Sequence, residues 1–265
     1  MPDRLDVATL RLAVAAEPLT ADAFAPFGDV IENSRPDVHP SQFAAAFGSL
    51  SPSAAAKLCS PVSANQGSAI KYQRVSRLAD RYDSGRAPSG KASEPLASMF
   101  VCAARELVQD SAGPAGSGLF PVTILERHPY TTQTFVPLST QSAANTRYLV
   151  IVAPNLNDDE TPSGMLTRSP PDVQRLRAFV ARGDQAVTYG AATWHAPMAA
   201  LGTPGTALPF FVFQFANGVG SEDCQEVVLD GGPGLPEGSS VVVRVPPTPG
   251  LPSSTTKSPG LWSKI

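Results

Sequence analysis

The stretch "LERHPYTTQTFVPL", residues 125–138, decides the fold, because it reads as β-strand although it contains a Glu, an Arg, a His and a Gln. The side chains of a strand point to its two faces in turn, so Ile124, Glu126 and His128 are expected to share one face. A buried face seldom holds a carboxylate and an imidazole, since a polar group buried without a partner costs free energy. This strand therefore carries a candidate functional site.

A second strand is predicted after a bend at Pro129, with Gln133 and Phe135 on one of its faces. If the two strands pair as a hairpin, the side chains of Glu126, His128 and Gln133 converge. The alternative interpretation is the mouth of a barrel, where the same polar side chains are merely solvated. The sequence keeps both interpretations open.

Histidine is rare in the chain, and two of its three copies lie in predicted hairpins. His128 lies in the first hairpin, and His195 lies in a second one, "GDQAVTYGAATWHAPM", at residues 183–198. His39 lies in a predicted loop and is expected to be solvated rather than functional. For His195, beside Trp194, a packed core imidazole is the alternative to a functional one.

The spacing of these polar residues resembles the first metal-binding motif of cupins, His-x-His-x(3,4)-Glu. Here Glu126 takes the place of a histidine, Gln133 takes the place of the acid, and the second motif is one residue out of register. Carboxylate, amide and imidazole groups can all bind divalent ions, and imidazole suits nickel, zinc, iron or manganese. The candidate metal ligands are Glu126, His128, Gln133 and His195.

Strand signals dominate the rest of the chain, and its 27 prolines and 21 glycines favour turns over long helices. Strands are expected at residues 29–32, 68–76, 96–106, 122–128, 132–138, 147–154, 185–190 and 210–217. Irregular loops are expected at residues 34–60, 79–95 and 107–118. The pattern predicts a mainly β protein, a β-barrel of the jelly-roll type with one or two flanking helices.

Two helices are expected beside the strands. The first starts at Thr20, whose hydroxyl can cap free backbone amides. The second covers residues 169–183, where Val173, Leu176 and Val180 follow helical spacing. Both would pack an apolar face on a sheet.

Residues 1–228 are expected to form a single domain. Residues 229–265 are rich in Pro, Gly and Ser, so they are expected to form a mostly disordered tail. Within this tail, only "SVVVRV" at residues 240–245 is a candidate strand, at the edge of a sheet.

Composition excludes several classes of function. With 42% apolar residues, 16% charged residues, a net charge of −3 and no block of Lys or Arg, nucleic acid is not an expected partner. No apolar run approaches the roughly 18 residues of a membrane span.

Three cysteines without a signal peptide, Cys59, Cys102 and Cys224, indicate reduced thiols in an intracellular protein. The final Ser-Lys-Ile is close to the peroxisomal signal Ser-Lys-Leu, so the cytoplasm is expected, with the peroxisome as the alternative.

Several stretches together resemble the ureidoglycolate lyase family in its fungal form. They are "LTADAFAPFGDVIE", "ANQGSAIKY", "ERHPYTTQTFVPL", "YLVIVAP", "PDVQRLRAFVARGDQAVTYGAATWHAPM" and "FQFANGVGSEDCQEV". The resemblance runs in order from residue 18 to about residue 228. It implies a cupin-like β-barrel, usually a homodimer, that splits (S)-ureidoglycolate into glyoxylate and urea in allantoin and purine catabolism. If a divalent metal is bound, the resemblance places nickel first, with zinc or manganese otherwise.

Positions matched in the resemblance, and their neighbours on the strands, give a candidate site. The catalytic candidates are Glu126, His128 and His195. The candidates for substrate binding are Asn65, Gln66, Gly67, Lys71, Gln133, Tyr189 and Gln214. Arg127 is a further candidate for the substrate carboxylate, but it alternates away from Glu126 and is expected to face solvent or bridge the dimer.

Two other functions fit the same residues. One is a different metal-dependent cupin enzyme that acts on a small acid, for which a stronger ligand set is expected. The other is a module that binds a ureide without turnover, for which the two histidines need not converge.

Overall fold

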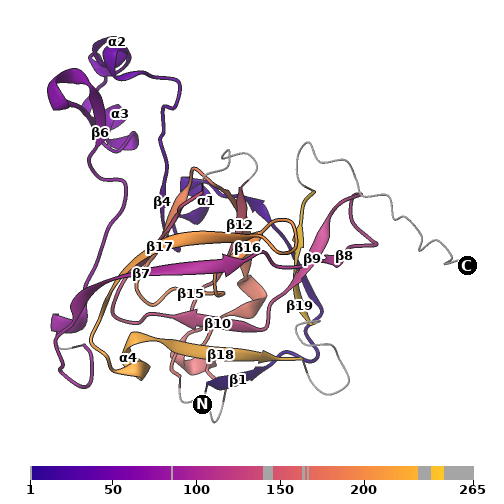
Figure 1. Ribbon diagram of the computed structural model, residues 1–265. Helices are drawn as coiled ribbons and strands as arrows, with labels where there is room; N and C mark the ends of the chain where they lie inside the picture. Colours follow the sequence, from indigo (N-terminus) through magenta and orange to yellow (C-terminus); the bar gives the residue numbers. More distant parts are fainter. Residues whose placement is uncertain are drawn as a thin grey trace, which may run out of the picture.

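The computed structural model describes residues 2–84, 86–139, 146–162, 165, 167–231 and 240–247. Within these residues the strands form four sheets, so the prediction of a mainly β protein is confirmed (Figure 1). The arrangement is compatible with a cupin-like fold, and closure into a barrel stays a prediction.

The largest sheet has eight strands, which are, in spatial order, β1 (Asp3–Asp6), β18 (Gln225–Asp230), β10 (Ile124–Arg127), β15 (Trp194–His195), β12 (Arg147–Ala153), β13 (Arg177–Arg182) and β3 (Glu17–Pro18), with β16 (Ala199–Leu201) beside β12. The five-stranded sheet contains β4 (Gly28–Ile31), β14 (Ala186–Tyr189), β11 (Gln133–Pro137), β17 (Ala207–Ala216) and β7 (Glu94–Ala103). The four-stranded sheet contains β2 (Leu12–Ala15), β19 (Val241–Val245), β9 (Gly118–Pro121) and β8 (Val108–Gln109). The last pair is β5 (Pro61–Ala64) and β6 (Ala69–Tyr72).

The helices are short. The α-helices are α1 (Ala21–Phe24), α2 (Phe43–Phe47), α3 (Pro52–Lys57) and α4 (Gly220–Asp223). The 3-10 helices are η1 (Pro40–Gln42), η2 (Asn65–Gly67), η3 (Tyr82–Ser84), η4 (Asp158–Glu160) and η5 (Val173–Arg175). Over the described part of the chain, no helix has the length and apolarity needed to cross a membrane.

Strand β12, in the interior of the eight-stranded sheet, is buried on both faces. Along β12, Leu149 and Ile151 pack in one apolar cluster with β19, whereas Val150 and Val152 pack in a second cluster with the five-stranded sheet. A strand buried on both faces reads as a continuous apolar run, which is the pattern of "YLVIVA".

The helix predicted over residues 169–183 is wrong. The segment forms the short η5 and then β13, which pairs with β12 along six residues. Ala178 packs in one apolar cluster and Phe179 in the other, so the run "AFVA" belongs to a strand with two buried faces. The helical spacing arose because such a run also satisfies a period of 3.6 residues. By contrast, the helix predicted from Thr20 is confirmed, since the Thr20 hydroxyl caps α1.

The hairpins predicted at residues 122–138 and 183–198 are also wrong; β14 and β15 of the second one lie in different sheets. β10 pairs with β15 and β18, whereas β11 pairs with β14 and β17 of the other sheet. The bend after His128 therefore carries the chain from one sheet to the sheet that faces it. Side chains from the two segments still meet, but across the space between two sheets.

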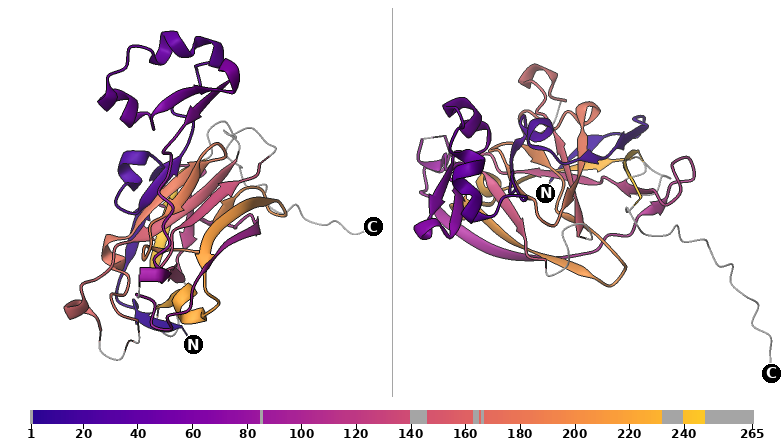
Figure 2. Two further views of the ribbon diagram at one scale, coloured as in Figure 1. Left: turned by 90° about the vertical axis from the view of Figure 1, so that its left-hand side faces the viewer. Right: turned by 90° about the horizontal axis from the view of Figure 1, so that it is seen from above.

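The irregular loop expected at residues 34–60 contains short helices instead. Together with β5 and β6 they form a projection, here called the arm (residues 33–75), that stands clear of the large sheets (Figure 1 and Figure 2, left). The arm packs around its own aromatic residues: the Phe47 ring lies 5.2 Å from the ring of Phe43 and 6.5 Å from that of Tyr72, between centroids.

The expected boundary at residue 228 falls inside β18, which continues to Asp230. The strand predicted at residues 240–245 is confirmed as β19, but it lies between β2 and β9 and is not at an edge. Val241, Val243 and Val245 of this strand are fully buried. Residues 232–239 and 248–265, with the terminal Ser-Lys-Ile, lie outside the described residues, and the division into domain and tail stays a prediction.

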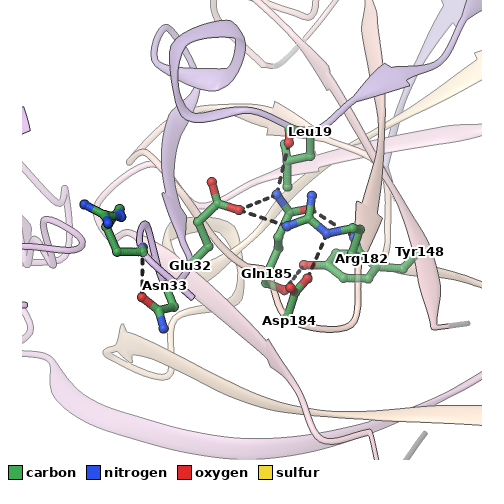
Figure 3. Close-up of polar contacts among 8 residues, drawn as sticks. Leu19, Glu32, Asn33, Tyr148, Arg182, Asp184 and Gln185 are labelled. Atoms are coloured by element: carbon green, nitrogen blue, oxygen red, sulfur yellow. Dashed lines mark hydrogen bonds and ion pairs between the residues drawn. The ribbon is translucent and has the colours of Figure 1, made fainter. Parts of the chain in front are cut away.

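A buried glutamine fixes the turn between β13 and β14 (Figure 3). The Gln185 amide nitrogen donates to the carbonyl of Leu19 at 3.0 Å and to the carboxylate of Glu32 at 2.8 Å. Its amide oxygen accepts from the backbone of Arg182 at 3.0 Å, and its own carbonyl accepts from the hydroxyl of Tyr148.

Replacement of Gln185 by alanine is expected to lower the free energy of unfolding by about 2–4 kcal/mol, because buried backbone groups lose their partners. Chemical denaturation measures this change. Asp184→Ala is the control, since Asp184 in the same turn bonds Arg182 at the surface, and its loss should lower the free energy of unfolding by less than about 1 kcal/mol. Equal effects of the two substitutions would contradict the assignment.

Candidate functional site

Two strands of the eight-stranded sheet bring a carboxylate and an imidazole together. Glu126 of β10 stands opposite His195 of β15 in the antiparallel register, so both side chains lie on the same face. The Nδ1 atom of His195 lies 3.8 Å from a carboxylate oxygen of Glu126. Trp194 points to the other face and packs in the apolar cluster there, which leaves His195 facing the five-stranded sheet.

His128 follows directly after β10 and completes a cluster of three. Its ring lies 5.6 Å from that of His195, between centroids. The Nδ1 atom of His128 lies 2.6 Å from the carbonyl oxygen of Asp223, at the end of α4. Since a carbonyl can only accept, Nδ1 carries the hydrogen and Nε2 keeps its lone pair. The Nδ1 atom of His195 faces the carbonyl of Ala196 at 3.2 Å, which favours the same tautomer.

The five-stranded sheet supplies the opposite wall. The Tyr189 ring stacks on that of His195 with centroids 4.0 Å apart and planes within 6°. Gln133 pairs with Tyr189 in the register, and its amide nitrogen donates to the amide oxygen of Gln214 at 2.6 Å. The site therefore lies between two sheets, with side chains from five strands and the segment after β10.

Several buried polar atoms of this site have no hydrogen-bond partner among the described residues. They are the Nε2 atoms of His128 and His195, the amide oxygen of Gln133 and the hydroxyl of Tyr189. Buried polar atoms are normally paired, and an exception calls for an unrecorded partner or a functional role. Atoms that all face one site are suited to bind a polar guest.

Burial moves the pKa values of the acid and the imidazoles in opposite directions. Burial first, and then the charge of Glu226, raises the pKa of Glu126 from 4.5 to about 7. Burial and the neighbouring His128 lower the pKa of His195 from 6.5 to about 3. Burial also lowers the pKa of His128, against the hydrogen bond to Asp223 and the nearby Gln133 side chain, which raise it. At neutral pH both imidazoles are neutral, while Glu126 is poised between its two states.

The donor set fits a divalent metal ion. One candidate ligand atom each from Glu126, His128 and His195 lies within 4.8 Å of the other two. The unpartnered Nε2 atoms carry lone pairs, and the free amide oxygen of Gln133 is a further neutral donor. The hydrogen bonds at Nδ1 orient the imidazoles as they are oriented in many metal sites. The four predicted ligands thus suit nickel, zinc or manganese, although nothing in the geometry selects one of them.

A second acidic group borders the site from outside. Cys224 and Glu226 offer ligand atoms within 4.8 Å of that of Glu126. Both residues line a surface cleft of about 410 Å³. Burial, with the nearby acids, raises the pKa of the Cys224 thiol to about 12, so it is protonated at neutral pH. The cleft is lined by Cys224 and Glu226, whereas Glu126 and the two histidines are not among its lining residues.

A larger cleft of about 800 Å³ lies elsewhere. It is lined by Arg147 at the start of β12, whereas His195 pairs with Val152 near the end of that strand. Five residues of strand span roughly 16 Å, so this cleft is separate from the histidines. Chemistry, rather than volume, identifies the site.

The structure brings together six of the ten residues predicted for the site. They are Glu126, His128, Gln133, Tyr189, His195 and Gln214. The other four, Asn65, Gln66, Gly67 and Lys71, lie in the arm, away from the histidines (Figure 1). Asn65 and Gln66 hold left-handed backbone conformations, with φ of 48° and 53°.

Two further predictions for single residues differ in outcome. His39 is exposed, as predicted, and caps η1. Arg127 was expected to face solvent or bridge a dimer, but it is buried, with 7% of its surface exposed, and lies against Trp194. Alternation did place it on the face opposite Glu126, but that face is covered by the chain's own segments.

The roles of Asp223, Cys224 and Glu226 were not predicted from the sequence. Glu226 stands opposite Glu126 in the pairing of β10 with β18, which no local pattern reveals. Asp223 contributes only a backbone carbonyl, so its side chain gives no signal. The available hint was that "EDCQEV" combines acids with the rare cysteine in one short segment.

In sequence the chain is similar to known ureidoglycolate lyases. A family model described as ureidoglycolate lyase matches residues 11–234. The ureidoglycolate lyase of Schizosaccharomyces pombe is 36% identical over 214 residues, which cover 80% of this chain and 89% of the relative. That of Saccharomyces cerevisiae is 36% identical over 141 residues, 52% of this chain and 62% of the relative. That of Burkholderia mallei is 32% identical over 189 residues, which cover 71% of this chain and 76% of the relative.

Proposed function

Because the chain belongs to the ureidoglycolate lyase family, we propose that it splits (S)-ureidoglycolate into glyoxylate and urea in allantoin and purine catabolism. The observation that carries the proposal is the convergence of Glu126, His128 and His195, with unpartnered acceptors, in a buried site of a chain from this family.

The reaction moves one proton and breaks one bond. The hydroxyl of ureidoglycolate loses its proton, its oxygen forms the carbonyl of glyoxylate, and the carbon–nitrogen bond breaks. The bonding electrons go to the ureido nitrogen, which takes up a proton and leaves as urea. No water is consumed, so the reaction is an elimination. A single group that accepts the first proton and donates it to the nitrogen satisfies the balance.

Glu126 is the group best suited to this transfer. A general acid–base catalyst is most effective when its pKa is near the working pH, and burial raises the pKa of Glu126 to about 7. Its carboxylate can take the hydroxyl proton, and the acid so formed can protonate the nitrogen. His195, with a pKa of about 3, is too weak a base for that step at neutral pH.

The neutral imidazoles position the substrate. The free Nε2 atoms of His128 and His195 can accept hydrogen bonds from the hydroxyl and ureido N–H groups, and the amide pair of Gln133 and Gln214 presents further polar atoms. If these residues instead held a divalent ion, with Glu126, His128, Gln133 and His195 as its ligands, the ion would acidify the substrate hydroxyl and orient it, and a group other than Glu126 would take the proton.

The test is an assay of purified protein with racemic ureidoglycolate. Urea and glyoxylate should appear in equal amounts, from one enantiomer only and faster than the spontaneous background. The assay is run with chelator and with added nickel, zinc or manganese. No release above background under any of these conditions would refute the proposal.

We also propose that the chain forms a homodimer through β7. This strand lies at the outer edge of the five-stranded sheet, where no described strand pairs with its free side. Its residues Met99 and Val101 are 65% and 68% exposed, and Phe211 of β17 lies beside Met99 in the register. A long apolar edge strand invites pairing, and a second copy can supply the same edge in antiparallel orientation.

The double substitution Met99→Lys/Val101→Lys is expected to weaken self-association by about 100-fold or more, because it brings like charges together at the edge. Analytical ultracentrifugation over a range of concentrations measures this. Leu78→Lys is the matched control, because Leu78 is 54% exposed but lies outside the sheets. A wild-type protein that is monomeric, or a dimer whose self-association is unchanged by the two lysines, would argue against this surface.

The remaining assignments are predictions. For Asn65, Gln66, Gly67 and Lys71 to bind substrate, the arm would have to move or reach the site of a partner subunit. An unchanged KM in the variant Lys71→Ala would exclude Lys71. The cytoplasm, with the peroxisome as alternative, stays the predicted compartment, and fluorescence microscopy of a tagged chain tests it.

A further inference from the structure

Arg127 is the centre of a buried frame on the face opposite Glu126. Its guanidinium carbon lies 4.6 Å above the ring of Trp194. Its nitrogens donate to the side chain of Gln225 at 2.9 Å and to that of Asn155 at 2.6 Å. They also donate to the carbonyls of Arg168 and Ser169, at 2.6 and 3.0 Å.

These contacts tie together segments that are far apart in the sequence. Gln225 belongs to β18, Asn155 follows β12, and the carbonyls belong to the segment before η5. The indole nitrogen of Trp194 donates to the Ser169 carbonyl that also accepts from Arg127. The guanidinium therefore fixes Trp194 in two ways: it packs on the face of the indole ring, and both groups donate to the Ser169 carbonyl.

The frame also holds backbone conformations that are otherwise unfavourable. Ser169 has φ of 48° and Ala192 has φ of 68°, in the left-handed region that residues with a Cβ atom rarely adopt. The carbonyl of Ala192 accepts from Asn155, and its amide donates to the carbonyl of His128. Such conformations persist where the surroundings over-determine them, and they cluster at functional sites.

The reacting groups are the immediate neighbours of this frame. Glu126 and His128 flank Arg127 in the sequence, and His195 follows Trp194 in a strand of only two residues. This short strand pairs with β10 on one side and with β12 on the other, and the orientation of its two side chains also depends on what holds Trp194. A rotation of Trp194 would carry the His195 ring away from Glu126.

We propose that Arg127 is a positioning residue for the reaction, which sets the placement of His195 relative to Glu126 through its contact with Trp194. This role rests on the proposed lyase function, since it concerns the same site. Arg127 touches no reacting atom, because its side chain lies on the opposite face of the sheet. The planar guanidinium, with its fixed fork of donors, is required: the ammonium of a lysine cannot serve the four acceptors and the indole face at once.

The experiment compares Arg127→Lys and Arg127→Met with Arg177→Met as the matched control. Arg177 also lies over an aromatic ring, that of Phe179 at 4.9 Å, and donates to a backbone carbonyl. It stands one strand away from His195, since both residues pair with Val152 of β12, but on the face opposite Trp194, so it controls for the loss of a nearby arginine that does not act through Trp194. Three quantities are measured: the melting temperature, the separate values of kcat and KM, and the nitrogen chemical shifts of the His195 ring in protein without substrate.

Both Arg127 variants are expected to lower kcat by about 10- to 100-fold, with KM within about threefold, and to shift or broaden the His195 ring signals. Arg177→Met should change only the melting temperature. A fall in melting temperature with unchanged kcat and unchanged ring signals in the Arg127 variants would overturn the proposal, since it would show a merely structural role.

Two further measurements keep the result decisive. If neither Arg127 variant folds, Asn155→Ala at an exposed position removes one bond to the guanidinium and one to the Ala192 carbonyl, and it should displace the same ring signals by a smaller amount. If the wild-type protein does not cleave ureidoglycolate, the proposed function fails, while the ring signals still report whether Arg127 fixes His195. Unchanged signals in Asn155→Ala as well would overturn the positioning role.

Discussion

Replacement of His195 by asparagine is expected to lower kcat/KM for ureidoglycolate by about 10²- to 10⁴-fold. The imidazole is fully buried, stacked on Tyr189 and 3.8 Å from Glu126, and its free Nε2 atom faces the site. Asparagine removes that acceptor and the stacked ring together, so the substrate loses both a contact and its alignment with the carboxylate. His128→Asn should cause a loss of the same order.

Steady-state kinetics with ureidoglycolate measure both variants, and circular dichroism establishes that they are folded. His39→Ala is the control, because it removes the third histidine of the chain at an exposed position in the arm and should leave kcat/KM within about twofold. If a folded His195→Asn variant kept the wild-type kcat/KM, the site between the two sheets would not be the place of the reaction.

The site residues could be predicted because strand alternation is a local property. Glu126 and His128 in "ERH" are two positions apart, and Gln133 and Phe135 are likewise two apart, so their faces follow from the sequence alone. The structure keeps these faces and brings the polar ones together. The partners of the strands could not be predicted in the same way, because pairing joins segments far apart in the sequence. Hence the predicted hairpin is wrong, although the side chains it was meant to unite do meet.

The wrong helix over residues 169–183 has a related cause. Val173, Leu176 and Val180 fit a helical period, and the first turn offered suitable capping residues. What decides the structure is that β13 lies between β12 and β3 with apolar clusters on both faces, so "AFVA" is buried on both sides. A short apolar run cannot be assigned to helix or strand by its period alone.

Arg127 shows what alternation leaves undetermined. The pattern correctly separated it from Glu126, but it could not say what covers the second face of the sheet. A charged residue on the far face was therefore expected at the surface. In the structure that face is covered by Trp194 and the segment at Ser169, which supply the acceptors that a buried guanidinium needs.

Replacement of Glu126 by glutamine is expected to abolish activity and to stabilise the metal-free protein. Glutamine has nearly the same shape but neither accepts nor releases a proton at neutral pH, so kcat should fall by at least about 100-fold. The stabilisation follows from the cost of burying a carboxylate: the pKa of Glu126 rises from 4.5 to about 7 on folding, chiefly through burial.

The direction of the pH dependence follows from proton binding. Between pH 4.5 and about 7 the folded protein binds the Glu126 proton more tightly than the unfolded chain does, so the free energy of unfolding falls as the pH rises. Above pH 7 the full cost is present, at most about 3 kcal/mol. The difference in free energy of unfolding between Glu126→Gln and the wild type should therefore be small below pH 4.5, increase up to pH 7 and then stay constant.

Chemical denaturation of both proteins with chelator at several pH values measures this difference. His195 acts in the opposite sense, because its lowered pKa costs stability as the pH falls below 6.5, but it is present in both proteins and largely cancels. Glu226→Gln is the control for the neighbouring charge: it should bring the pKa of Glu126 closer to its ordinary value and reduce this difference. If the free energy of unfolding of Glu126→Gln at pH 8 were no higher than that of the wild type, burial of the ionised carboxylate would not destabilise the protein. The pKa of Glu126 would then not be raised, and this argument for Glu126 as the group that transfers the proton would fail.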